Sequence, residues 1–88
     1  MDIEFDNAKR NLTLTERGLD FADVAALDWD TALTVEDVRN SYGERRFVTL
    51  GMIHNRLCVV AWTPRGTALR VISLRKANSR ERKRYDQS

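Results

Sequence analysis

The chain has 88 residues, of which 42% are hydrophobic and 32% are charged, and its formal net charge is +2. This length supports one small hydrophobic core, so we expect a single domain spanning residues 1–88 without a large ligand cavity. A lone cysteine, Cys58, excludes an internal disulfide, and no apolar stretch approaches the ~18 residues of a membrane helix, which together favour a cytoplasmic protein.

The first third of the chain predicts two short helices in succession. Asp6 is a suitable N-cap for a helix that we expect to run to about Arg17, and Gly18 suits its left-handed end. Asp20 is the N-cap of the second predicted helix. Its buried face at helical spacing consists of Phe21, Val24, Ala25 and Leu27.

After these helices the hydrophobic period becomes alternating, which predicts strands. The expected strands are residues 33–38, 46–50, 57–62 and 69–74. Short turns join them, among them His54-Asn55 and the segment from Thr63 to Gly66, so neighbouring strands should be antiparallel. The segment 57–62 is apolar throughout and predicts a central strand that is buried on both faces.

A terminal surface helix should follow the sheet, because Asn78 with Glu81 three residues later has the spacing of a capping box. The predicted fold class is therefore α+β: two N-terminal helices, an antiparallel sheet of about four strands covered on one face, and a C-terminal helix. In the last strand, simple alternation predicts that Arg70 and Arg75 lie on opposite faces.

The two halves of the chain carry opposite charge. Residues 1–44 hold four Lys/Arg against eleven Asp/Glu, whereas residues 45–88 hold eleven against two. A basic surface on a small domain attracts phosphate backbones through Coulomb attraction and counterion release, without reading base sequence. The cluster from Arg70 to Arg84 therefore favours a nucleic-acid ligand over its alternative, a solvated basic face that complements the acidic half.

Motifs for metal, nucleotide or nucleophilic catalysis are absent from the sequence, so no cofactor is expected. The single histidine, His54, falls in a predicted hairpin turn and is better explained as a turn residue than as a general base. RNA needs neither a metal nor an enzyme nucleophile, because its own 2′-hydroxyl can attack the adjacent phosphate. Several arginines and one proton acceptor would suffice to orient the backbone and stabilise the added charge.

Short motifs along nearly the whole chain occur in the order typical of one family. They are Phe5-Asp6 with Lys9 and Asn11, Gly18-Leu19-Asp20-Phe21, Gly43-Glu44 with Arg46 and Gly51, Arg56-Leu57, Trp62-Thr63, and Arg70-Val71-Ile72-Ser73-Leu74-Arg75-Lys76-Ala77 with Glu81-Arg82 and Tyr85. On these residues the chain resembles the BrnT family of type II toxins, and the terminal stretch is the most specific part of the match.

The resemblance implies a RelE-like ribonuclease fold, cleavage of RNA without a metal or cofactor, and growth arrest. It also implies neutralisation by a BrnA-type antitoxin whose ribbon-helix-helix part binds the operon's DNA, so that operator DNA is reached only through the antitoxin. RNA and this antitoxin are the expected partners, and no membrane is involved.

Matching the family residue by residue implies the roles of individual side chains. Arg75 and Arg80 are the expected phosphate and transition-state clamps, and Arg70 is either a substrate-positioning residue or a structural ion pair. Glu44 is the candidate base. Tyr85 also matches and could stack on a base, although a packing role is common for such a residue. The expected RNA-binding residues are Lys9, Arg17, Arg46, Lys76, Lys83 and Arg84.

Two segments depart from the family pattern. Glu16-Arg17-Gly18 stands where the family usually has Lys-His-Gly, and Phe5 stands where a tryptophan is common. The guanidinium of Arg17 can bind phosphate but cannot act as a base near neutral pH. A second hypothesis is therefore a non-catalytic RNA- or antitoxin-binding module that retains the toxin fold. A third is a structural interaction domain whose acidic half pairs with a basic partner.

Overall fold

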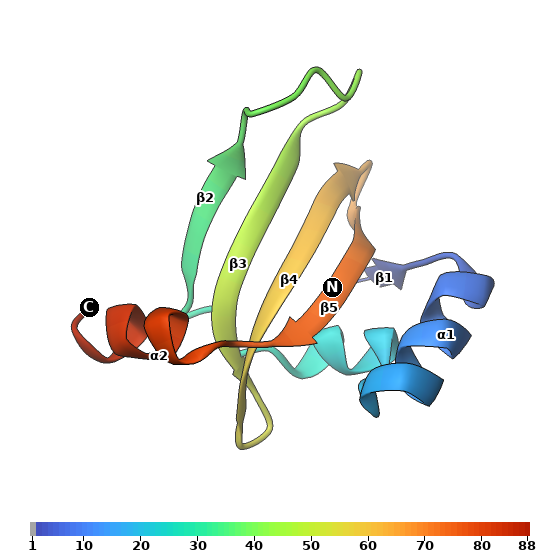
Figure 1. Cartoon of the computed structure of the whole chain (residues 1–88). Coiled ribbons are helices and arrows are strands. Elements are labelled where there is room, and N and C mark those ends of the chain that lie inside the picture. The colour runs from blue at the N-terminus through green and yellow to red at the C-terminus, as the bar shows by residue number, and fades with distance from the viewer. Residues whose placement is uncertain (1) are drawn as a thin grey trace.

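The computed structural model describes residues 2–88 as one mixed five-stranded sheet with three helical segments around it (Figure 1). The elements are β1 (Asp2–Glu4), α1 (Asn7–Arg17), the 3-10 helix η1 (Phe21–Ala26), β2 (Leu33–Asp37), β3 (Arg46–Ile53), β4 (Arg56–Arg65), β5 (Ala68–Lys76) and α2 (Ser79–Asp86). The strand order across the sheet is β1-β5-β4-β3-β2, in which β1 is parallel to β5 and all other neighbours are antiparallel. The α+β class is confirmed.

Strand β4 lies at the centre of the sheet, as its uninterrupted apolar run predicts. Its residues 57–60 are buried. Both faces of a central strand are covered when elements pack on each side of the sheet, which explains why no polar alternation is visible in this segment.

The helical face of the sheet is the side that α1 and η1 cover, and it holds most of the core. Phe21 and Val24 of η1 are 1% and 0% exposed, and they pack against Val60, Val71 and Leu74 of the sheet. A buried aliphatic or aromatic side chain stabilises a fold by roughly 1.5–3 kcal/mol relative to exposure, so this short helix contributes much of the core.

The open face is the opposite side of the sheet, formed by alternate residues of β2, β3, β4 and β5. Helix α2 covers only one end of it, where Ala77 and Tyr85 pack against Leu50, Leu57 and Val59. The expected sheet covered on one face is therefore corrected to a sheet with helical elements on both faces. These apolar contacts come from Tyr85 of α2 and from Ala77, which precedes the helix, and they were too few to predict the packing from a hydrophobic pattern.

The local caps are those that the sequence predicts. Asp6 accepts a hydrogen bond from the Lys9 backbone N–H at 3.0 Å, and Asp20 accepts one from Ala22 at 3.0 Å. Gly18 ends α1 with φ of 66°, a left-handed conformation that favours glycine. At α2 both halves of the predicted capping box form. These caps can be predicted from the sequence because each depends on residues within four positions of one another.

Three details of the predicted fold were wrong. The sheet has five strands, because the three-residue β1 joins the edge of β5, and so short a segment shows no period. The second helix is a 3-10 helix, in which Ala25, expected on the buried face, is exposed. Pro64 lies inside β4, paired with Leu69, and the turn falls at Gly66 and Thr67 instead. Among the described residues no helix is long and apolar enough to cross a membrane.

Candidate functional site

A β-bulge in β5 brings two of the predicted catalytic arginines onto one face of the sheet. Arg70 pairs with Thr63 and Arg75 pairs with Val59, but the register between the two pairs shifts because Ile72 is an extra residue on β5. Partners in an antiparallel ladder point to the same side, and Thr63 and Val59 are an even number of residues apart. Arg70 and Arg75 therefore both lie on the open face, which corrects the prediction from simple alternation.

A cationic cleft of about 260 Å³ lies beside Arg70, where β4 ends and the N-terminus of α1 approaches the sheet. Four of the residues that line it are cations. The cleft is lined by Asp6, Lys9, Tyr42, Glu44, Arg46, Thr63, Arg65, Arg70, Val71 and Ile72. The structure therefore brings the predicted residues Lys9, Glu44, Arg46 and Arg70 together in one polar cavity.

The charges within the cationic cleft are only partly neutralised. Glu44 lies 3.1 Å from Arg46 and 3.7 Å from Arg65, so the candidate base is shared between two guanidinium groups. Arg70 lies 3.8 Å from Glu4 of β1, a long contact at a partly exposed position that holds the arginine weakly. The cleft retains an excess of positive charge and suits an anion.

Arg46 makes a cation–π contact with Tyr42, in which the guanidinium carbon lies 4.0 Å from the centroid of the ring. The phenol of Tyr42 also donates a hydrogen bond to Asp37 at 3.1 Å, which ties the loop before β3 to the end of β2. Sequence reasoning missed both Tyr42 and Arg65 as residues of the cleft. The only signal for Tyr42 was its position next to the Gly43-Glu44 motif, and no spacing pointed to Arg65.

Arg75 is engaged by a carboxylate of α2. Its two terminal nitrogens each donate a 2.8 Å hydrogen bond to Glu81, whose Oε1 also accepts the backbone N–H of Asn78 at 2.9 Å. The Arg75 guanidinium is the main reason that the pKa of Glu81 falls to about 2. The predicted phosphate clamp is thus held by a paired anion that a phosphate would have to displace.

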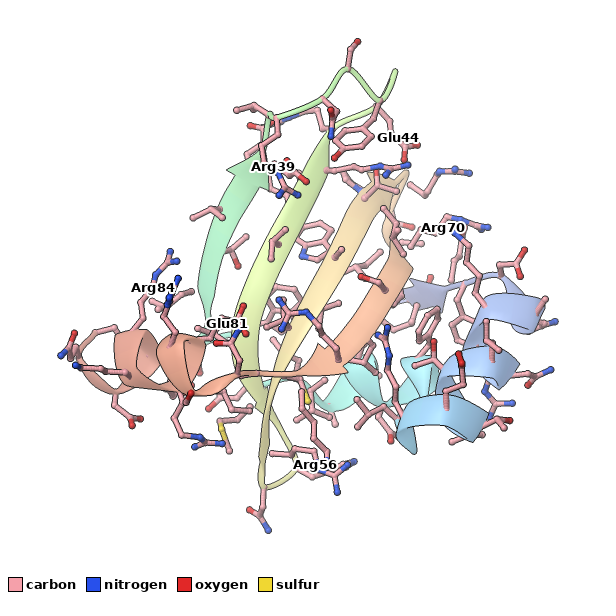
Figure 2. All side chains as sticks on the ribbon, in the orientation of Figure 1. Arg39, Glu44, Arg56, Arg70, Glu81 and Arg84 are labelled. Carbon is pink, nitrogen blue, oxygen red and sulfur yellow. The ribbon has the colours of Figure 1, made fainter. Side chains whose placement is uncertain are left out.

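The remaining basic residues of α2 are exposed, and Tyr85 packs at its end. Arg84 borders the open face beside Leu33 and Val35, whereas Arg80 and Lys83 form no ion pair with any described residue. Figure 2 shows Arg84 and Glu81 beside α2, and Arg70 and Glu44 away from α2, towards the opposite end of the sheet.

Tyr85 is held in place by contacts that the sequence does not show. Its hydroxyl donates to Thr31 Oγ1 at 3.0 Å, while its ring packs on the open-face cluster of Leu50, Leu57 and Val59. The side chain is therefore partly buried in a packing role, and stacking on a base would require it to leave this contact.

Two of the predicted RNA-binding residues lie away from the open face. Arg17 donates a 2.8 Å hydrogen bond to the backbone carbonyl of Leu74, which ties the end of α1 to the end of β5. Lys76 pairs with Cys58, whose thiol belongs to the core of the helical face. Neither residue can share a phosphate with Arg70 without a conformational change.

His54 lies in the β3–β4 turn, 4.0 Å from Asp23, at the opposite end of β4 from the cleft.

Comparison with known proteins supplies independent evidence. The family model described as "Ribonuclease toxin, BrnT, of type II toxin-antitoxin system" matches residues 5–81. The crystal structure of the Brucella abortus ribonuclease toxin, BrnT, superposes with a TM-score of 0.68 at 29% sequence identity, covering 90% of this chain and 99% of that chain. A search of curated proteins found no match.

Proposed function

The chain belongs to the BrnT family of ribonuclease toxins of type II toxin–antitoxin systems, and from this premise we propose that it cleaves RNA along the open face without a metal ion. The phosphate backbone would lie across β5, from the cationic cleft at Arg70 towards Arg75 and the basic residues of α2. Arg80 and Arg84 would extend this binding surface along the helix.

The observation that carries this proposal is the bulge at Ile72. Without the extra residue, Arg70 and Arg75 would point to opposite sides of β5. With it, they share a face and are separated by about four strand positions, or roughly 13 Å along the strand. Two cations on one rigid strand can hold an RNA backbone at two points, and such fixed orientation is a major part of catalysis by positioning.

The chemistry proposed for the site is attack of an RNA 2′-hydroxyl on the adjacent phosphate. This step forms a 2′,3′-cyclic phosphate and breaks the bond from phosphorus to the 5′-oxygen, which leaves as a hydroxyl after it takes a proton from water. The arginines would stabilise the negative charge that develops on the phosphate oxygens, and Arg75 would exchange its ion pair with Glu81 for the phosphate. Glu44 is the proposed proton acceptor, since its carboxylate lines the cleft beside Arg46, whereas Asp6, the other carboxylate there, accepts the N-cap hydrogen bond of α1. Phosphate binding to Arg46 and Arg65 would release Glu44 from its present ion pairs.

The partner proposed for neutralisation is a BrnA-type antitoxin with a ribbon-helix-helix part, and contact with operator DNA would occur only through that antitoxin. The family description supports a protein antitoxin, because type II toxin–antitoxin systems are pairs of proteins. A cytoplasmic site of action is proposed on the same basis, since cellular RNA is the substrate.

The test is incubation of purified protein with single-stranded RNA in EDTA. We expect cleavage by the wild type and a loss of at least 100-fold for Arg70→Ala, because that variant removes a charge from the scissile region. Arg56→Ala is the matched control, since Arg56 is an exposed arginine at the other end of the sheet (Figure 2). Intact RNA at high enzyme excess would contradict metal-independent cleavage, and equal losses in both variants would contradict the placement of the site.

A specific observation favours the second candidate, a non-catalytic RNA- or antitoxin-binding module. Arginines engage several of the carboxylates that border the open face, among them Glu44, Asp37 and Glu81. A carboxylate with a pKa near 2, such as Glu81, is a poor proton acceptor near neutral pH. Retained RNA affinity without cleavage in the EDTA assay would identify the protein as this module.

A further inference from the structure

A second depression on the open face differs in chemistry from the cationic cleft. This valine groove has a volume of about 410 Å³ and lies between β2 and β5. Its lining residues are Val35, Glu36, Asp37, Val38, Arg39, Val48, Val59, Ala61, Ser73 and Arg75. Val35 is 51% exposed and Val38 is 78% exposed, so aliphatic surface faces water at one end of the groove.

The valine groove adjoins a free edge of the sheet. Strand β2 is last in the strand order and pairs with β3 alone, so one side of its backbone has no partner strand among residues 2–88 (Figure 1). Unpaired N–H and C=O groups on an edge strand are a template for a further strand. At the opposite edge, β1 pairs with residues 68–70 of β5, and farther along β5 the carbonyl of Leu74 already accepts a hydrogen bond from Arg17 of α1.

The charges around the valine groove are neutralised within the protein itself. Arg39 donates to both oxygens of Asp37 at 2.9 Å, and Arg75 donates to both oxygens of Glu81 at 2.8 Å. Because each arginine makes two hydrogen bonds to one carboxylate, each ion pair is strong and its two charges neutralise one another. A groove with aliphatic walls and paired charges is suited to an uncharged apolar segment.

We propose that the valine groove and the edge of β2 bind one extended segment of the antitoxin, added as a sixth strand beside β2. This proposal rests on the proposed function in one respect, that the protein has a protein antitoxin. Recognition by strand addition draws affinity from backbone hydrogen bonds and specificity from alternate side chains. The segment that fits has aliphatic residues at every second position.

The register of β2 determines which side chains the added strand meets. Leu33, Val35 and Asp37 pair with Leu50, Val48 and Arg46, so they point to the open face. Every second side chain of a neighbouring strand would point the same way and lie about 5 Å from Val35. Aliphatic side chains there would cover the groove and reduce the access of RNA to Arg75, which forms its far wall.

The test measures binding of the cognate antitoxin to full-length toxin variants. Val35→Lys puts a charge into the groove at a position exposed enough to accept it, and we expect the dissociation constant to rise at least tenfold. Leu12→Lys is the matched control, because Leu12 is 59% exposed on α1 and lies outside the groove. Its antitoxin affinity should stay within twofold of the wild type.

Backbone pairing is tested separately by amide hydrogen exchange of the toxin with and without the antitoxin. Strand addition predicts new protection at the outward amides of β2, with little change in α1. Protection of α1 without β2, or a larger loss of affinity in Leu12→Lys than in Val35→Lys, would overturn the proposal.

Two further outcomes identify a different occupant and also overturn the proposal. A Val35→Lys variant that binds the antitoxin normally but loses self-association in sedimentation would assign the groove to a second copy of the chain. A Val35→Lys variant that binds the antitoxin normally but cleaves RNA more slowly would assign the valine groove to RNA. RNA cleavage by the free wild type is measured first, so that a failed ribonuclease is distinguished from a misplaced antitoxin surface.

Discussion

Replacing Glu81 with glutamine tests how the open face balances stability against RNA binding. The carboxylate of Glu81 accepts both 2.8 Å hydrogen bonds from Arg75, and its side chain is 23% exposed. Glutamine keeps one oxygen that can accept from the Asn78 backbone N–H, so the capping box survives in part. The variant therefore removes the charge while disturbing the helix start as little as possible.

The expected loss of stability follows from the pKa of Glu81. A fall from the ordinary value of 4.5 to about 2 corresponds to at most roughly 3 kcal/mol. Arg75 is 44% exposed, so solvent screening reduces the expected loss to about 1–2 kcal/mol at pH 7. Urea unfolding of Glu81→Gln against the wild type measures it.

The stability that Glu81 contributes should depend on pH in a defined direction. Because folding lowers its pKa, the contribution is fully present above pH 4.5 and is lost as the pH falls towards 2. By pH 3 the difference between wild type and variant should be less than half of its value at pH 7. A difference that stays constant from pH 7 to pH 3 would refute the ion-pair account.

RNA binding should change in the opposite sense, because Glu81→Gln frees the Arg75 guanidinium for a phosphate. One more phosphate contact steepens the dependence of log affinity on log salt by about 0.7 for a single strand. Asp86→Asn is the control, since Asp86 lies on the same helix and forms no ion pair with any described residue. An equal change in both variants would mean that net charge, and not release of Arg75, is responsible.

Three further changes test the fold that holds the site. Phe21→Ala should cost about 3–5 kcal/mol, since Phe21 is 1% exposed, and a thermal melt should show a partly unfolded protein near 37 °C. Gly18→Ala should cost about 1–2 kcal/mol in urea because φ is 66°, whereas a stabilised variant would contradict the left-handed cap. Thr49→Val should cost about 1–3 kcal/mol, because it leaves the Trp62 indole N–H without its 2.8 Å acceptor. Tryptophan fluorescence during urea unfolding measures this last effect.

Residue type predicted many members of the candidate site, but it did not predict how their side chains lie relative to one another. The basic residues Lys9, Arg46 and Arg70 were expected to bind RNA or act on it, and the structure places them in one cleft. Arg17 was chosen on the same grounds, yet it holds a backbone carbonyl on the other side of the molecule. Charge shows that a residue suits phosphate, but the direction of a side chain depends on the packing of distant segments.

The pairing of Arg75 with Glu81 illustrates the same limit. Both residues stood out in the sequence, Arg75 as a clamp and Glu81 as part of a capping box, but each was assigned a separate role. They meet because α2 turns back over the open face after β5, where Ala77 and Tyr85 pack on the sheet. Two apolar contacts decide this path, and they are too few to appear as a hydrophobic period.

The sequence by itself determined the helix caps, the central strand and the basic C-terminal half, because each of these depends on residues that are close together in the chain. Only the tertiary structure decided that Ile72 forms a bulge, that β1 joins the sheet beside β5, and that β2 is left with a free edge. These features depend on how strands align over many residues. A shift of one residue in register moves every following side chain to the other face, and nothing local to Arg70 or Arg75 reports it.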